Sequence, residues 1–185
     1  MRRYILTGTP GAGKTSILRG LARRGYRVVQ EAATQVIADG QARGVPEPWT
    51  GPTFIDDIVV RQRERQLAAA GPPDGVWVFD RSPVCTHALA VYLGLPVTPT
   101  LARELDRIVT ERPYQRQVFF VRSLGFVRPT AARRISLADA LEFERVHEES
   151  YRAFDFELVD VAADLLDRRV SVVEAAITAL NGAGG

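Results

Sequence analysis

The chain has 185 residues, of which 46% are hydrophobic and 25% charged, as is usual for a single globular domain. Its one cysteine, Cys85, excludes a disulfide framework and favours a cytoplasmic setting, and no apolar run predicts a signal peptide or a membrane span. A net charge of +2 does not by itself indicate a nucleic-acid partner.

Short apolar runs alternate with helical patterns, which is typical of a parallel sheet with helices on both faces. The expected strands are Arg3–Thr7, Arg27–Val29, Val76–Phe79, Val118–Val121 and Glu157–Val161. The expected helices are Lys14–Arg24, Ala32–Ala42, Thr53–Ala70, Pro83–Leu93, Pro99–Glu111, Leu137–Ala153 and Ser171–Leu180. Together they predict one α/β domain over residues 1–180, a three-layer α/β/α sandwich with a five-stranded parallel sheet.

Helix ends are marked by particular residues. Gly25 is expected to follow the end of the first helix, where the backbone turns left-handed. Ser136 is expected to cap one helix, and Ser171 another through a capping box with Glu174. Residues 181–185 are expected to form a disordered tail.

The residues from Gly8 to Thr15 match the pattern G-x-x-x-x-G-K-[ST], between an expected strand and an expected helix. The glycines let several backbone N–H groups turn towards phosphates, Lys14 can reach the β- and γ-phosphates, and the Thr15 hydroxyl can bind Mg²⁺. The sequence therefore predicts a site for ATP or GTP with Mg²⁺; the alternative is a glycine-rich turn that binds nothing. The predicted contact residues are Gly8, Pro10, Gly11, Ala12, Gly13, Lys14, Thr15 and Ser16.

Charged side chains follow the second and third expected strands, and ligands bind at such strand ends in parallel sheets. Glu31 could accept a proton from a substrate hydroxyl or hold the metal, or it could only stabilise the start of a helix. Asp80 follows an apolar run and is a candidate Mg²⁺ ligand, while Arg81 could contact phosphate or carboxylate. The alternative for Asp80 and Arg81 is a pair that caps the next helix.

Residues of about 122–136 form a long irregular segment that is expected to act as a lid. Its arginines could neutralise the charge of a transferring phosphoryl group, or they could belong to a solvated basic loop. Arg128 and Arg133 are predicted to contact the nucleotide, and Arg134 is a candidate catalytic residue.

Three further side chains are candidates for contacting a planar acceptor molecule. Trp49 and Phe54 could stack on a ring, and Trp49 could equally fill the core. Gln62 follows an apolar helix face and could point an amide inward. The remaining groups with chemical potential, Cys85, His87 and His147, are expected to be packing residues.

These motifs resemble the small P-loop predicted ATPases of AAA type, related to the kinase domain of the bacterial nicotinamide riboside kinase/regulator and to deoxynucleoside kinases. The resemblance runs from about Arg3 to about Leu180 and rests on Gly8–Thr15, Gly25–Val29 leading into Glu31, Arg61–Gln62, Phe79–Ser82, and Arg134 to Tyr151. The sequence departs from the family where it usually has an arginine after the second-strand acid, here Ala33, and an aspartate in the lid, here Ala131 and Ala132.

The resemblance implies a nucleoside-kinase-like fold, Mg-ATP as cofactor and Glu31 as the base. The leading hypothesis is a kinase that transfers the γ-phosphoryl group to a small hydroxylated molecule. The alternatives are an ATPase or nucleotide switch acting on a protein partner, and a kinase of nucleic-acid ends, which the absence of a basic stripe interleaved with aromatic residues disfavours.

Overall fold

A computed structural model describes residues 1–72, 75–125 and 136–182. The strands are β1 (Arg2–Thr7), β2 (Arg27–Val29), β3 (Val76–Asp80), β4 (Gln117–Val121) and β5 (Glu157–Val161). The helices are α1 (Lys14–Arg23), α2 (Ala32–Ala42), the 3₁₀ turn η1 (Pro48–Thr50), α3 (Phe54–Ala68), α4 (Pro83–Tyr92), α5 (Pro99–Glu111), α6 (Leu137–Ala153) and α7 (Leu166–Gly182).

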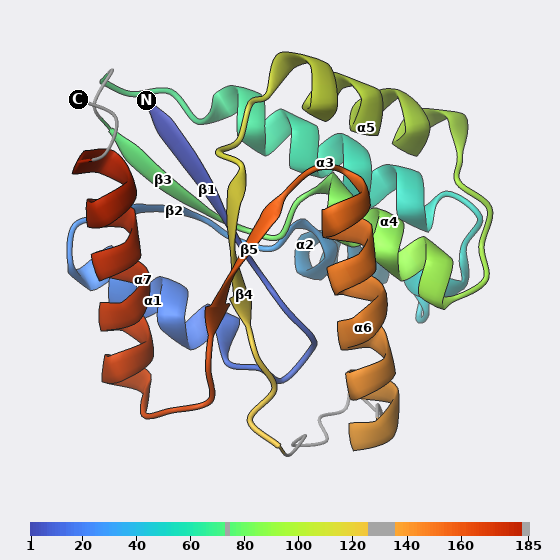
Figure 1. Ribbon diagram of the computed structural model, residues 1–185. Helices are drawn as coiled ribbons and strands as arrows, with labels where there is room; N and C mark the ends of the chain where they lie inside the picture. Colours follow the sequence, from blue (N-terminus) through green and yellow to red (C-terminus); the bar gives the residue numbers. More distant parts are fainter. Residues whose placement is uncertain (73–74, 126–135, 183–185) are drawn as a thin grey trace.

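All strands of the sheet are parallel, in the order β2-β3-β1-β4-β5 (Figure 1). Strand β1 lies in the centre, with Ile5 opposite Phe79 of β3 on one side and Val118 of β4 on the other. The carboxyl ends of β1, β2 and β3 therefore lie side by side at one edge of the sheet. The expected α/β/α sandwich with a five-stranded parallel sheet is confirmed.

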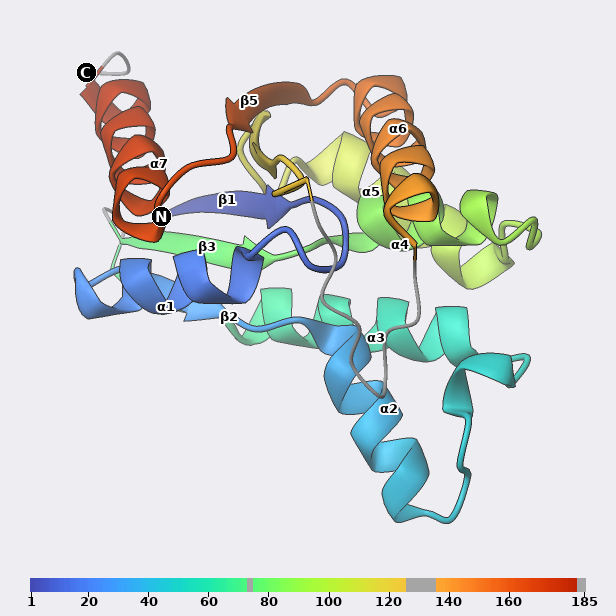
Figure 2. The same ribbon diagram turned by 90° about the horizontal axis from the view of Figure 1, so that it is seen from below.

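The two faces of the sheet are covered by different helices, because successive side chains of a strand point to opposite faces. Tyr4 and Leu6 of β1 pack in a core with α1 and α7, whereas Ile5 packs in a core with α3, α4, α5 and α6. Figure 2 shows this division, with α1 and α7 on one side of the sheet and α3 to α6 on the other. Helix α2 packs on α3 through a separate, smaller hydrophobic cluster.

Two of the expected helix ends are confirmed. Gly25 has φ 91°, its N–H donates to the Ala22 carbonyl and the Tyr26 N–H donates to the Leu21 carbonyl, which is a Schellman ending of α1. At the start of α6, the Ser136 hydroxyl accepts from the Asp139 N–H and the Asp139 carboxylate accepts from the Ser136 N–H, forming a capping box.

The start of the last helix was predicted wrongly. Helix α7 begins at Leu166, so Ser171 lies inside the helix and is not its N-cap. The reason is that Val170, Val173 and Ile177 form one continuous buried face on the sheet, which extends the helix towards its N-terminus. The helix also continues to Gly182, and the Asn181 side chain accepts hydrogen bonds from β1. The expected tail at 181 and 182 is therefore helical, and 183–185 lie outside the described residues.

The chain's described portion contains no helix that is both long enough and apolar enough to cross a bilayer.

Candidate functional site

The loop between β1 and α1 is shaped by glycines in the left-handed region of φ. Gly8, Gly11 and Gly13 have φ values of 133°, 87° and 89°. A Cβ at Gly8 would lie 2.3 Å from the Val121 carbonyl oxygen, so the loop can leave the sheet this close to β4 only at a glycine. The loop ends at the N-terminus of α1, where helix N–H groups and the helix dipole favour an anion.

Lys14 is the only lysine in the sequence and lies buried in the first turn of α1. Its Nζ atom donates to the carbonyl oxygens of Gly8 (2.9 Å) and Thr9 (2.8 Å), inside the loop. Burial, and then the charge of Arg81, lower the pKa of Lys14 to about 8, with Asp80 and Glu31 opposing the shift. The lysine is thus held where an anionic ligand of the loop would restore its full charge.

A second cation, Arg169 of α7, supports the loop from below. Its side chain is buried, and its Nη1 donates to the Ala12 carbonyl (2.8 Å) while its Nη2 donates to the Arg122 carbonyl (3.1 Å). Burial lowers the pKa of Arg169. Arg169 was not predicted as a site residue, because nothing in the sequence near the C-terminus indicates that this side chain packs beneath the loop at Ala12.

Glu31 and Arg81 meet at the adjacent strand ends. Arg81 Nε donates to Glu31 Oε1 at 2.6 Å, and both side chains are largely buried. Burial alone would lower the pKa of Arg81, but Cys85, Glu31 and Asp80 outweigh it and raise the pKa. Glu31 occupies the N-cap position of α2, where the helix dipole favours a carboxylate; its side chain makes no hydrogen bond to the helix backbone, and its Oε2 accepts from the Thr34 hydroxyl at 3.1 Å. Asp80 ends β3 and is buried beside this pair.

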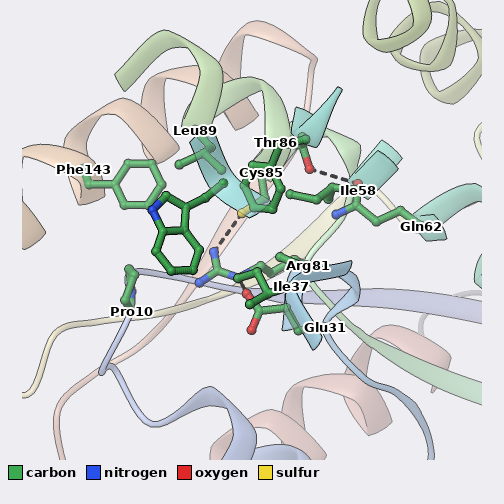
Figure 3. Close-up of a pocket in the computed structure, with 13 residues that line it drawn as sticks. Pro10, Glu31, Ile37, Ile58, Gln62, Arg81, Cys85, Thr86, Leu89 and Phe143 are labelled. Carbon is green, nitrogen blue, oxygen red and sulfur yellow. Dashed lines mark hydrogen bonds and ion pairs between the residues drawn. The ribbon is translucent and has the colours of Figure 1, made fainter. Parts of the chain in front are cut away.

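A cavity of about 310 Å³ opens above the Glu31–Arg81 pair (Figure 3). One wall carries the Gln62 amide, whose Oε1 accepts from the Thr86 hydroxyl at 2.9 Å. Trp49 lines the cavity and is 42% exposed, so it does not fill the core. The lining residues are Pro10, Glu31, Ala33, Ile37, Trp49, Phe54, Ile58, Gln62, Arg81, Cys85, Thr86, Leu89 and Phe143.

The structure brings together most of the predicted site residues. Pro10 of the loop and Arg81 share the cavity, and Asp80 and Lys14 lie within electrostatic reach of each other. Thr15 and Ser16 are exposed in the first turn of α1, whereas Ala12 is buried in the loop. The predicted lid arginines Arg128, Arg133 and Arg134 lie outside the described residues.

Arg122, at the start of the predicted lid, is held within the fold. Its guanidinium forms ion pairs with Glu144 (3.2 Å) and Glu148 of α6 and with Asp160 of β5 (2.7 Å), and it lies over the ring of Phe120. Three carboxylates compensate its charge, so Arg122 anchors α6 to the sheet.

We expect the amine of Lys14 to titrate near pH 8 in the ligand-free protein. With lysine labelled by ¹³C, NMR should show a single side-chain signal whose pKa is about 8. ATP should raise that pKa, because phosphate charge favours the ammonium form, and ATP affinity should therefore fall as the pH rises above about 8. A pKa at or above 10.5 without ATP would contradict this assignment.

Arg169→Met should destabilise the protein, because the Ala12 and Arg122 carbonyl groups lose their charged donor. The free energy of unfolding should drop by about 2 kcal/mol in denaturant titrations, and ATP affinity should fall as the loop loosens. Arg168→Met is the matched control, because the Arg168 side chain is 73% exposed on the same helix. Equal effects of the two substitutions would refute a role for Arg169 beneath the loop.

Two solved structures share this fold. A deoxyadenosine kinase from M. mycoides with the products dCMP and a flexible dCDP bound superposes with a TM-score of 0.63 at 14% identity, covering 96% of this chain and 99% of that one. A structure of deoxyadenosine kinase from M. mycoides with bound dATP gives 0.54 at 13% identity, with coverages of 95% and 99%. At these identities the likeness establishes the fold.

No curated protein matches the sequence. A family model described as an AAA domain matches residues 3–169, which include the phosphate-binding loop, both strand ends and Arg169. The protein therefore belongs to this AAA-domain family of P-loop proteins.

Proposed function

We propose that the protein is an ATP-dependent phosphotransferase that transfers the γ-phosphoryl group to a hydroxyl of a small molecule bound in the cavity. The observation that carries the proposal is the Glu31–Arg81 pair, which joins the ends of β2 and β3 at the cavity lined by Pro10 of the phosphate loop. A base and a cation beside both a phosphate loop and a largely apolar pocket suit transfer to a bound alcohol better than transfer to water.

Each residue of the site has a separate role in the proposed reaction. The backbone of the loop and Lys14 hold the β- and γ-phosphates, and Glu31 accepts the proton of the acceptor hydroxyl. The hydroxyl oxygen forms a bond to the γ-phosphorus as the bond between that phosphorus and the β–γ bridging oxygen breaks, leaving ADP. Arg81 holds the Glu31 carboxylate through the ion pair and faces the negative charge that develops during transfer.

The oxygen donors at the site fit Mg²⁺. Thr15 supplies a hydroxyl in the first turn of α1 and Asp80 a carboxylate at the end of β3, and protein-bound Mg²⁺ commonly takes one or two protein ligands with substrate phosphates. Within residues 1–72, 75–125 and 136–182 no group of three or more His, Cys, Asp or Glu side chains could hold a metal alone. The ion would supply charge neutralisation between the β- and γ-phosphates.

The lining of the cavity favours an uncharged acceptor with a planar ring. Among the described residues that line this pocket, Glu31 and Arg81 are the only charged side chains, and they are paired with each other. Phe54 and Phe143 supply aromatic walls, and Gln62 supplies an amide for a polar ring edge. A nucleoside-like alcohol fits this combination, and the fold shared with a deoxyadenosine kinase supports testing nucleosides first.

The proposal is tested with radiolabelled ATP and a panel of nucleosides, ribosylated pyridines and aminoglycoside-like alcohols. A phosphorylated product that forms faster than ATP is hydrolysed supports it. Hydrolysis of ATP without product across the panel would favour the alternative, a nucleotide-dependent switch that acts on a protein partner.

Glu31→Gln should lower kcat by roughly 10²- to 10⁴-fold, because the amide cannot take the proton, while the Kd for ATP changes little. Glu64→Gln is the matched control, since the Glu64 side chain is 62% exposed on α3. Steady-state kinetics and calorimetric ATP binding check both variants. An equal loss of turnover and of ATP binding would show that Glu31 is a structural residue.

Asp80→Asn should remove most Mg²⁺-dependent activity and leave the fold intact. The carboxylate is lost, but the side chain keeps its volume in a buried position. Activity measured against Mg²⁺ concentration, with circular dichroism as the folding check, tests this expectation. Asp106→Asn, at an exposed position of α5, should behave as wild type; wild-type Mg²⁺ dependence in Asp80→Asn would remove Asp80 from the metal site.

A further inference from the structure

Arg81 adopts a backbone conformation that arginine rarely takes. Its φ is 73°, in the left-handed region, and its N–H donates to the Leu6 carbonyl at 3.0 Å. Such a conformation costs free energy and persists where surrounding contacts fix it. The Glu31 ion pair holds Nε, so the other end of the guanidinium is the part that needs a second support.

That second support is a chain of polar contacts from α4 and α6. Arg81 Nη1 donates to Cys85 Sγ at 2.8 Å, Cys85 Sγ lies 2.9 Å from His147 Nε2, and His147 Nδ1 lies 2.9 Å from the Phe143 carbonyl oxygen. A carbonyl oxygen only accepts, so Nδ1 carries the ring proton and Nε2 accepts. The Cys85 S–H group therefore donates to His147, which leaves the sulfur electron pairs turned to Arg81.

His147 has no solvent exposure and packs edge-on against the ring of Phe143, with 4.1 Å between the two ring centroids. Burial, followed by the charge of Arg81, lowers the pKa of His147 to about 3. Lys14 also disfavours the imidazolium form, and Glu144 and the hydrogen bond to Phe143 oppose the shift without overcoming it. The imidazole is therefore neutral at assay pH and keeps the acceptor that Cys85 needs.

We infer that Cys85 and His147 are positioning residues for the phosphoryl transfer, forming a buried clamp that fixes the guanidinium of Arg81 against Glu31. We call Cys85 and His147 the Arg81 clamp. It rests on the proposed function, because positioning matters for a reaction in which Glu31 and Arg81 take part. Cys85 and His147 are buried, as expected of packing residues. Their hydrogen bonds to Arg81 and to each other were not predicted.

The clamp is tested first by paired substitutions. Cys85→Ala and His147→Leu each remove one member of the Arg81 clamp. Each should lower kcat about tenfold, which is the effect of one lost charge-assisted hydrogen bond, and leave the KM for ATP within twofold of wild type. Cys85→Ser and His147→Gln restore an acceptor and donor near the lost atoms and should recover most of kcat. The control His87→Leu changes a histidine that contacts Ser150 and Phe154 and does not line the cavity.

A double-mutant cycle separates positioning from general damage. In an Arg81→Met background, Cys85→Ala should change kcat by less than twofold, because the group it positions is gone. If Cys85→Ala costs its full tenfold in that background, the clamp acts elsewhere and the inference is overturned. Unchanged kcat in folded Cys85→Ala and His147→Leu, or losses that the conservative variants do not recover, would overturn it as well.

A readout without turnover distinguishes failure of the clamp from failure of the proposed function. The ¹⁵Nε signal of Arg81, assigned by its loss in Arg81→Lys, should shift and broaden in Cys85→Ala and stay near wild type in Cys85→Ser. If the wild-type protein phosphorylates no acceptor but Arg81 shows this NMR response, the kinase proposal is rejected and the clamp is retained. An unchanged Arg81 signal in Cys85→Ala would reject the clamp.

Discussion

The ion pair between Glu31 and Arg81 is the contact on which the arrangement of the site depends. It ties the end of β2 to the end of β3, and it does so beside the loop that leaves β1. Since the three strands are parallel neighbours, their carboxyl ends must lie at one edge, and the pair turns that shared edge into one electrostatic unit. Lys14 and Asp80 belong to the same unit, because Arg81, Asp80 and Glu31 all affect the pKa of Lys14 and Asp80 also affects the pKa of Arg81.

The phosphate-binding loop and the charged residues that follow β3 could be predicted from the sequence, because the patterns that indicate them are local. The strand that ends at Thr7, the glycines after it and Lys14 form a single continuous pattern, and Asp80 and Arg81 directly follow an apolar run. The alternation of strands and helices also predicted a five-stranded parallel sheet, whereas the strand order β2-β3-β1-β4-β5 was not predicted and comes from the structure. Residues that act next to their own strand could be predicted as members of one site without knowledge of any contact.

The residues that were missed act across long distances in sequence. Arg169 reaches the loop at Ala12, and His147 reaches Cys85 on another helix. Neither forms a motif, and each is recognisable only when two helices pack on the sheet. The start of α7 was misplaced for a related reason, since Ser171 and Glu174 form a plausible local cap, whereas burial of Val170 against the sheet decides where the helix lies. Tertiary packing overrode the local signal in that case.

Arg81, Arg122 and Arg169 are compensated in different ways, and the difference bears on the electrostatic potential at the loop. Arg122 forms ion pairs with carboxylates of α6 and β5. Arg81 forms an ion pair with Glu31 and a hydrogen bond to the sulfur of Cys85, so both arginines have partners within the protein. The hydrogen bonds of Arg169 Nη1 and Nη2 run to carbonyl oxygens, which do not cancel the charge of the guanidinium. Its field therefore adds to the N-terminal end of α1 and to Lys14 beneath the same loop. A loop with this excess of positive potential favours a polyanion, and burial of Lys14 makes full protonation of its amine depend on that anion.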